Sequence, residues 1–337
     1  MNLAERITLL TDLGTWIESK PNELKAAVQK SHYDNKWFVP DNCWYALEGI
    51  SKQFLQKDKL EKFTGNYNFS NITPKVIGLI FAGNIPLVGF HDFLTVFLSG
   101  HRAQIKLSDK DTALFKAIWD FLNTQYANFA DIIQLTQKLT TFDAVIATGS
   151  DNSARQFAYY FKSYPKIIRK NRNAVAILSG QETDTDLENL CKDIAMYFGL
   201  GCRNVSKLFI PKDYDFGPLF KALDKWSWMM DHYKYSNNYQ FNYATFALNR
   251  NAFLSNGSTI LIEENQIPSR ISTVHFEYYD NIEKVEKQVI KYKENIQCVV
   301  GPIELTSIDS ILPGNTQKPL LEDYADNVDT MEFLLQL

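Results

Sequence analysis

The run Val76-Ile77-Gly78-Leu79-Ile80-Phe81-Ala82-Gly83-Asn84-Ile85-Pro86 decides the fold of this chain. Its first six residues are apolar apart from one glycine, which is typical of a short strand buried on both faces. Gly83 and Asn84 end that strand, and Pro86 predicts the first turn of a helix that extends to Leu98. A strand that leads directly into a helix indicates a βα unit.

The same alternation continues beyond this unit. Strands are expected at 103–107, 142–148, 174–178 and 206–210, and helices at 112–124, 153–163, 184–198 and 216–228. A second group follows, with strands at 259–263, 272–278 and 299–300 and a helix at 281–293. Strands that alternate with helices favour a mostly parallel, doubly wound sheet. We therefore predict an α/β fold with two doubly wound α/β units.

The first 70 residues differ from this pattern. Apolar residues recur there at helical spacing, as at Ile7, Leu10 and Leu13, and predict a helical region packed on the core. The predicted organisation is an N-terminal helical region at 1–70, α/β domains at 71–180 and 181–305, and a C-terminal tail at 306–337. We expect the tail to return to the core or to an oligomer interface.

Composition excludes several classes of function. The 337 residues carry a net charge of −4, so no overall basic field favours nucleic acid or an anionic membrane. No apolar run is long enough to span a membrane, and the first residues lack the pattern of a secretion signal. The four cysteines include no Cys-x-x-Cys pair, and no two histidines lie three or four residues apart, so no metal site is expected. These features predict a cytoplasmic protein with reduced thiols.

Cys202 is the candidate nucleophile. It follows Gly199-Leu200-Gly201, a segment whose glycines permit an open backbone that presents the thiol to a ligand. Arg203 is a cationic neighbour that could favour the thiolate, the reactive form of cysteine. The alternative is that Cys202 is a small buried apolar residue.

Three further segments place polar groups at the ends of expected strands, where ligands bind in open α/β sheets. Asn84 has a side-chain amide suited to an oxyanion, although it could instead cap a helix. Lys106, in Ile105-Lys106-Leu107-Ser108, could reach a nucleotide phosphate or ribose, or lie on the surface as an ordinary lysine. Thr148-Gly149-Ser150 could direct backbone N–H groups at a pyrophosphate or a ribose. Neither a Gly-x-Gly-x-x-Gly fingerprint nor a P-loop is present.

Taken in order, Gly83-Asn84-Ile85-Pro86, Ile105-Lys106-Leu107-Ser108, Thr148-Gly149-Ser150 and Gly201-Cys202 resemble the aldehyde dehydrogenase superfamily. In that superfamily an Asn-x-Pro turn supplies an oxyanion donor, a Lys-Pro-Ser turn binds the cofactor ribose, a Thr-Gly-Ser turn opens a helix, and a cysteine attacks the carbonyl. The longer stretches 82–92 and 201–207 look like long-chain acyl-CoA reductases of the LuxC type, which make aldehydes from activated fatty acids. The tail segments Thr316-Gln317-Lys318-Pro319 and Asp323-Tyr324-Ala325-Asp326 look like the end of such proteins.

The resemblance implies an aldehyde-dehydrogenase-like fold in which 71–180 binds the cofactor and 181–305 is catalytic. It implies catalytic roles for Cys202 and Asn84. It implies that NADPH (or NADH) is held by Lys106, Ser108, Thr148, Gly149 and Ser150. The substrate would be an acyl-CoA or another activated acyl group, and the protein would be a homo-oligomer.

The chain departs from the superfamily at two places. The glutamate that serves as the base for hydrolysis has no counterpart in Ile167-Ile168-Arg169-Lys170-Asn171, which favours a reductase over a hydrolytic dehydrogenase. Ser269-Arg270-Ile271-Ser272 lies where a Glu-x-Phe-Gly-Pro motif would hold the nicotinamide ribose. The implied function is reduction of an acyl thioester to an aldehyde through an acyl-cysteine. The alternatives are a cysteine-dependent acyltransferase or thioesterase without a redox cofactor, and a catalytically silent partner in an assembly.

Overall fold

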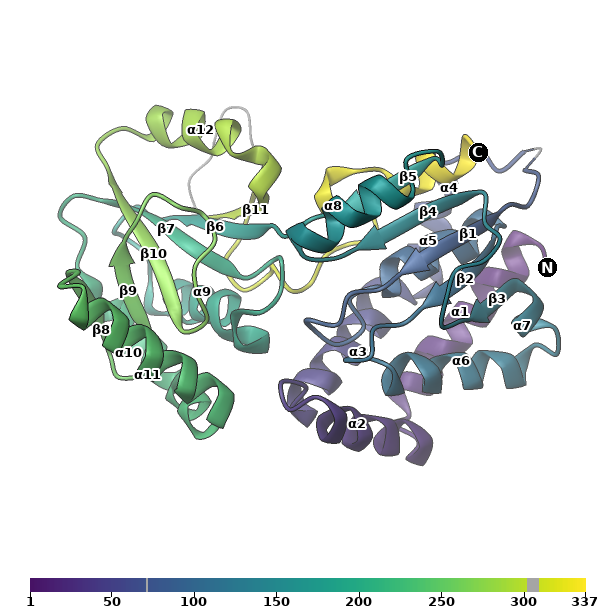
Figure 1. Cartoon of the computed structure of the whole chain (residues 1–337), viewed down its shortest axis with the longest axis horizontal. Helices are drawn as coiled ribbons and strands as arrows, with labels where there is room; N and C mark the ends of the chain where they lie inside the picture. The colour runs from purple at the N-terminus through teal and green to yellow at the C-terminus, as the bar shows by residue number, and fades with distance from the viewer. Residues whose placement is uncertain (71, 302–308) are drawn as a thin grey trace. The chain divides into compact units, whose positions relative to one another are not determined.

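Alternating strands and helices form two compact units in the computed structural model of the chain, which describes residues 1–70, 72–301 and 309–337 (Figure 1). Unit 1 consists of Met1–Asn171 and Pro319–Leu337, and unit 2 consists of Arg172–Lys318. The boundary after Asn171 precedes the one expected after residue 180. The boundary expected at 305/306 lies outside the described residues.

Four helices begin unit 1: α1 (Leu3–Glu18), α2 (Asn22–Asp34), α3 (Pro40–Phe54) and α4 (Lys57–Gly65). A capping box starts α1, because Asn2 accepts from the N–H of Glu5 while the Glu5 carboxylate accepts from the N–H of Asn2. The apolar faces of these helices join one buried cluster with the first sheet, and burial of that surface is the main stabilising term.

The first sheet contains β1 (Val76–Ile80), β2 (Arg102–Lys106), β3 (Ile133–Leu135), β4 (Ala144–Thr148) and β5 (Lys166–Arg169). Its order is β3-β2-β1-β4-β5, and every pair is parallel. The chain moves outward from β1 to β3 and then returns to β4 on the other side of β1. This reversal makes the carboxyl ends of β1 and β4 a topological switch point, where ligands bind in open α/β sheets.

The helices of this sheet are α5 (Phe90–Ser99), α6 (Ala113–Gln125), α7 (Phe129–Ile132) and α8 (Asp151–Tyr160). The helix expected from Pro86 begins only at Phe90, because Leu87 adopts a left-handed conformation with φ of 56°. The backbone N–H of Leu87 donates to the Asp111 carboxylate at 2.7 Å, and this bond holds the segment outside the helix.

Unit 2 contains a sheet of order β12-β11-β6-β7-β10-β9-β8, parallel except for the β8–β9 pair. The strands are β6 (Asn173–Ile177), β7 (Val205–Pro211), β8 (Phe253–Ser255), β9 (Ile260–Glu263), β10 (Thr273–Tyr279), β11 (Ile296–Val300) and β12 (Ser310–Ile311). The strand expected at 174–178 falls within the α/β domain predicted at 71–180, but β6 pairs with β7 and β11 of unit 2. Strand pairing is a long-range property that a local apolar run does not specify.

Helices α9 (Asp184–Ala195) and α10 (Phe216–Leu223) cover one face of this sheet, and α12 (Ile282–Lys291) covers the other (Figure 1). Alternate residues of one strand serve the two faces: Ala174 and Ala176 of β6 join the cluster with α9, whereas Val175 joins the cluster with α12. The remaining long helix, α11 (Tyr233–Leu248), packs beside the 3₁₀ segment Asp224–Asp231.

The expected C-terminal tail is divided between the units: its described residues up to Lys318 belong to unit 2, and Pro319–Leu337 belong to unit 1. Its helix α13 (Thr330–Leu335) packs on α5, and a buried Arg169 links the tail to the sheet. The Arg169 guanidinium pairs with Asp92 at 2.7 Å and also donates to the Ala325 carbonyl and to Thr330.

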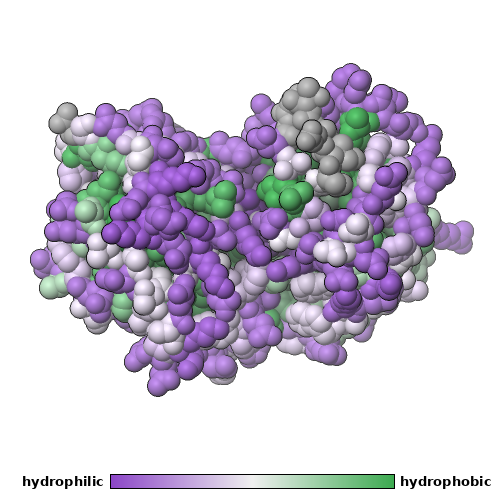
Figure 2. Space-filling model, turned by 180° about the vertical axis from the view of Figure 1, so that it is seen from behind, coloured by the Kyte–Doolittle hydropathy of each residue, from purple (hydrophilic) through white to green (hydrophobic). Residues whose placement is uncertain are grey.

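Hydrophilic residues cover most of the face shown in Figure 2, with apolar residues visible only in small patches. No helix among the described residues combines the length and apolar character needed to cross a bilayer.

Candidate active site

The predicted cofactor residues and Asn84 lie at one edge of the first sheet. In the parallel register Ile80 of β1 lies beside Lys106 of β2, and β4 runs along the other side of β1. The segments that follow these strands, 81–89, 107–111 and 149–150, therefore leave the sheet at its carboxyl edge. This edge contains the switch point between β1 and β4.

Asn84 is exposed in the loop that joins β1 to α5. The residue that precedes α5 is Gly89, five residues further on, so Asn84 does not cap this helix. The structure thus removes the helix-cap interpretation and leaves the Asn84 amide at the carboxyl edge of the sheet.

Close packing determines the shape of the Asn84 loop. A Cβ atom on Gly83 would lie 2.5 Å from the Ser108 Oγ, and one on Gly89 would lie 2.3 Å from the ring of Phe81. The Asp111 carboxylate, which accepts from Leu87, is buried, and burial raises its pKa to about 7. Its Oδ1 atom has no hydrogen-bond partner in the described part of the chain.

Lys106 and Ser108 follow the same edge. Lys106 is the last residue of β2, its side chain is half-buried, and its carbonyl accepts from the N–H of Phe81 at 3.1 Å. The Ser108 hydroxyl accepts from the N–H of Lys110 at 3.3 Å and packs under Gly83. Ser108 therefore also supports the Asn84 loop, a role that sequence reasoning missed.

The Thr148–Ser150 turn joins β4 to α8. Ser150 is the N-cap of α8, and its hydroxyl accepts from the N–H of Ser153 at 3.3 Å. Gly149 donates to the Arg169 carbonyl, and a Cβ atom there would lie 2.7 Å from the Cβ of Ser153. Glycine is thus required for the close approach of this turn to the helix.

Cys202 lies in unit 2, in the turn between the 3₁₀ segment Met196–Gly199 and β7. Its side chain is partly exposed, whereas Cys43 and Cys191 are each 0% exposed. Burial raises the thiol pKa of both Cys43 and Cys191, so neither is suited to act as a thiolate. Of these three thiols, Cys202 has the exposure that a nucleophile needs.

Asn204 builds the turn that presents Cys202. Its side chain is 1% exposed and accepts from the N–H of Gly201 at 2.8 Å. Its amide nitrogen donates to the carbonyls of Asp193 and Met196, each at 2.9 Å, and to that of Ile194 at 3.3 Å. Asn204 therefore satisfies carbonyls that the end of α9 leaves without intrahelical partners. The motif that contains Cys202 also contains Asn204, but only the fold reveals these partners.

The segment before the turn has an unusual backbone. Tyr197 and Phe198 have positive φ values of 55° and 59°, and Gly199 follows at 74°. Positive φ is costly for large side chains and persists only where the surroundings impose it. Phe198 is buried and contacts Trp228, His232 and Tyr235, which supplies that constraint.

Asp193 anchors the same helix end to a distant loop. Its buried carboxylate accepts from the N–H of Gly314 at 2.6 Å, and from the N–H and hydroxyl of Thr316 at 3.2 and 2.8 Å. Burial raises the pKa of Asp193, although these three donors oppose the shift. The Thr316 motif found in the sequence thus supports the helix that leads to Cys202.

The two departures from the superfamily pattern have structural roles in this chain. Arg169 occupies the stretch that lacks the glutamate and is committed to the buried pair with Asp92. In the other stretch, Ser269 donates to the Thr273 carbonyl at 2.6 Å and Arg270 donates to Asn242 at 3.4 Å. Among the described residues, no group of three or more His, Cys, Asp or Glu side chains could hold a metal ion.

The fold matches solved structures of aldehyde dehydrogenases. Aldehyde dehydrogenase 21 from Physcomitrella patens, in complex with the reaction product succinate, has a TM-score of 0.69 at 9% identity, over 100% of this chain and 84% of that one. The indole-3-acetaldehyde dehydrogenase of P. syringae, a mutant in complex with NAD+ and IAA, has a TM-score of 0.67 at 13% identity, over 89% of this chain and 72% of that one. The NAD+ complex of an aldehyde dehydrogenase from Bacillus cereus has a TM-score of 0.63 at 14% identity, with coverage of 89% and 72%.

These matches confirm the predicted α/β, aldehyde-dehydrogenase-like fold. At such low identity the likeness concerns the fold alone. Comparison of the sequence with models of protein families, and with curated proteins, finds no match.

Proposed function

We propose that this chain is an NAD(P)H-dependent acyl-CoA reductase that makes an aldehyde from an acyl thioester. The observation that carries the proposal is the Cys202 turn: a partly exposed thiol on a backbone held by four buried hydrogen bonds of Asn204. A covalent catalyst needs a reachable nucleophile in a fixed position. The aldehyde-dehydrogenase-like fold supports the same proposal, because two of the matched structures contain NAD+.

In the proposed reaction the Cys202 thiolate attacks the thioester carbonyl, and the carbon–sulfur bond to CoA breaks. CoA leaves as a thiol after taking a proton, and an acyl-cysteine remains. From the resemblance to the superfamily, we assign oxyanion binding to the Asn84 amide and the backbone N–H of Cys202. One such donor stabilises the transition state by about 3–4 kcal/mol. When the acyl carbon is reduced, the bond to Cys202 breaks, the thiolate is restored and the aldehyde is released.

Reduced nicotinamide would supply the hydride. The carboxyl edge of the first sheet fits such a group, because it combines a switch point with the Lys106 ammonium, the Ser108 hydroxyl and the Thr148–Ser150 turn. Asp151 in the first turn of α8 has the wrong charge for a phosphate. We therefore assign the turn at Thr148, Gly149 and Ser150 to ribose hydroxyls, and the phosphates to Lys106.

The reductive direction is supported by the stretch that the resemblance matches to the hydrolytic base of the superfamily. Arg169 lies in that stretch, and its guanidinium is already paired with Asp92. Without a carboxylate from this stretch to activate water, an acyl-cysteine would be hydrolysed more slowly and could be reduced first. This reasoning favours reduction over hydrolysis.

Mass spectrometry tests the covalent step. The whole chain is mixed with octanoyl-CoA in the absence of NAD(P)H, and an octanoyl adduct is expected on the peptide that contains Cys202. Cys202→Ala should abolish both the adduct and aldehyde formation, whereas Cys298→Ala, at another partly exposed thiol of unit 2, should retain both. An adduct that persists in Cys202→Ala contradicts the assignment.

The redox step has its own readout. Oxidation of NAD(P)H should depend on the acyl-CoA and yield the aldehyde. An adduct without consumption of NAD(P)H would indicate an acyltransferase or thioesterase, and no adduct would indicate a silent partner. Asn84→Ala should lower kcat by about 10²–10³. A change confined to KM would remove Asn84 from the oxyanion site.

A further inference from the structure

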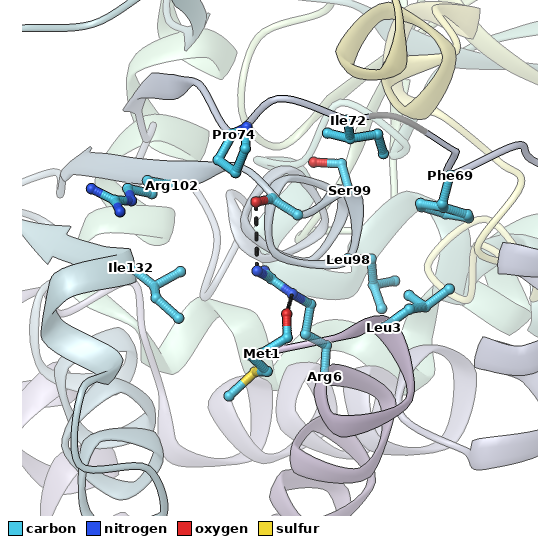
Figure 3. Close-up of a pocket in the computed structure, with 11 residues that line it drawn as sticks. Met1, Leu3, Arg6, Phe69, Ile72, Pro74, Leu98, Ser99, Arg102 and Ile132 are labelled. Carbon is cyan, nitrogen blue, oxygen red and sulfur yellow. Dashed lines mark hydrogen bonds between the residues drawn. The ribbon is translucent and has the colours of Figure 1, made fainter.

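A hollow lies at the amino edge of the first sheet, the edge opposite to the one that carries Asn84 and Lys106 (Figure 3). Its volume is about 400 Å³, within the range of small-molecule sites. It lies near the first residue of β2 and the residue before β3, so it is at the opposite ends of these strands from Asn84. The walls combine polar groups with apolar side chains, and the apolar residues include Met1, Leu3, Phe69, Ile72, Leu98 and Ile132.

A buried guanidinium lies within this lining. Arg6, from α1, is only 7% exposed, and Figure 3 shows its guanidinium in the middle of the hollow. Its Nε donates to the Met1 carbonyl at 3.3 Å, and its two terminal nitrogens donate to the carbonyls of Phe97 and Gly100. Arg102, which also lines the hollow, is exposed and directs its guanidinium away from Arg6 (Figure 3).

The hydrogen bonds of Arg6 leave part of its capacity unused. A guanidinium carries five N–H donors, and the three carbonyl acceptors leave two of them over. No ion pair between described residues includes Arg6, and its nearest acidic neighbour in sequence, Glu5, caps α1 instead. The carbonyls at the end of α5 offset part of the charge, but a buried cation without a counter-ion still has a desolvation cost.

We propose that this hollow binds a monocarboxylate with an apolar body, such as a medium-chain fatty acid. The planar carboxylate matches the two remaining N–H groups of Arg6, and its single negative charge would pair with a buried guanidinium that has no ion pair among the described residues. The aliphatic chain lies against the apolar walls and removes their surface from water. A phosphate dianion would need a second cation beside Arg6. The Met1 ammonium is paired with the Glu5 carboxylate at 4.0 Å, and the Arg102 guanidinium is exposed and points away from Arg6 (Figure 3). The site lies within unit 1 and does not depend on the reaction proposed for Cys202.

Calorimetric titration of the whole chain tests the ligand class. Octanoate is expected to bind saturably, while octan-1-ol, which has the same chain without the charge, should bind at least about tenfold more weakly. Inorganic phosphate should neither bind at this site nor compete with octanoate. Equal affinity for octan-1-ol, or competition by phosphate, would overturn the assignment to a monocarboxylate.

Two substitutions test the location. Ile132→Trp should fill the hollow without changing the carbonyl partners of Arg6 and weaken octanoate binding at least about tenfold, whereas Ile132→Leu should retain it. Arg6→Lys keeps the positive charge but removes the planar guanidinium that could bind a carboxylate through two N–H groups. It should also weaken octanoate binding at least about tenfold. Retention of full affinity by either Ile132→Trp or Arg6→Lys, with an unchanged Tm, refutes the site. Cys202→Ala should bind octanoate as the unsubstituted chain does, which separates this test from the test of catalysis.

Discussion

Replacement of Asn204 by alanine tests whether the Cys202 turn is held as the structure indicates. The substitution leaves the N–H of Gly201 buried without its acceptor, which costs about 1–3 kcal/mol. It also removes the two 2.9 Å bonds to the carbonyls of Asp193 and Met196, each worth about 0.5–1.5 kcal/mol. The local free energy of opening should therefore fall by about 2–6 kcal/mol.

Native-state hydrogen exchange, resolved by peptide, measures this loss over residues 190–205. The turn should lose protection while peptides of unit 1 keep theirs, because the Asn204 side chain bonds to Gly201, Asp193, Ile194 and Met196, which lie in unit 2. Asn204→Asp is the sharper variant: it keeps an acceptor for Gly201 but places a carboxylate oxygen against three carbonyls, so it should also destabilise. Asn237→Ala, at an exposed asparagine of α11, should change stability by less than about 0.5 kcal/mol.

Reactivity separates positioning of Cys202 from general stability. In Asn204→Ala, alkylation of Cys202 by iodoacetamide should become faster because the turn opens, while acyl transfer from octanoyl-CoA should become slower because the thiol is no longer fixed. The alkylation rate of Cys298 serves as the internal control and should not change. Unchanged exchange and unchanged rates for Cys202 would refute the role assigned to Asn204.

Two further predictions concern the loop that carries Asn84. Gly89→Ala should destabilise unit 1 by about 1–3 kcal/mol in urea denaturation, because its Cβ would lie 2.3 Å from the Phe81 ring, whereas Gly49→Ala, in an open helical position, should stabilise by about 0.5–1 kcal/mol. Asp111 has a pKa of about 7 in the fold and about 3.9 when unfolded, so stability should fall as pH rises from 4 to 7. Asp111→Asn should flatten that part of the pH profile, and an unchanged slope would contradict the burial of a charge there.

Much of the fold could be predicted because its strands are buried on both faces. Apolar runs bounded by glycine or polar turns can be recognised as buried strands from the sequence alone. Examples are Val76–Ile80 and Ala144–Thr148. The start of α5 could not be predicted in this way. Its displacement to Phe90 depends on a bond from Leu87 to Asp111, which lies 24 residues further along the chain.

Sheet membership was also beyond local reasoning. Asn173–Ile177 has the same apolar character as the strands of unit 1, yet it pairs with β7 and β11. Its neighbours in the sheet, β7 and β11, both follow it in sequence. The five residues of β6 themselves do not indicate which strands they pair with. The sheet to which a strand belongs therefore could not be predicted here, because its pairing partners lie far from it in sequence.

The residues of the candidate site likewise differ in whether the local sequence could identify them. The groups proposed for chemistry, Cys202, Asn84 and Lys106, carry local signals, since each stands at a strand end or beside glycine. The residues that hold these groups in place carry no such local signal. Only the fold shows that Asn204 and Asp111 accept hydrogen bonds from the buried N–H groups of Gly201 and Leu87.

Those supporting groups explain why each part of the proposed site can be rigid by itself. The Asn84 loop is held by Ser108, Asp111 and the ring of Phe81, all in unit 1, and the Cys202 turn is held by Asn204 in unit 2. A catalytic group is preorganised only if the residues around it are themselves fixed, and buried hydrogen bonds with close packing fix these. The strain at Tyr197 and Phe198 is tolerated for the same reason, because the aromatic contacts of Phe198 and the hydrogen bonds of Asn204 restrain the backbone on both sides of Gly199.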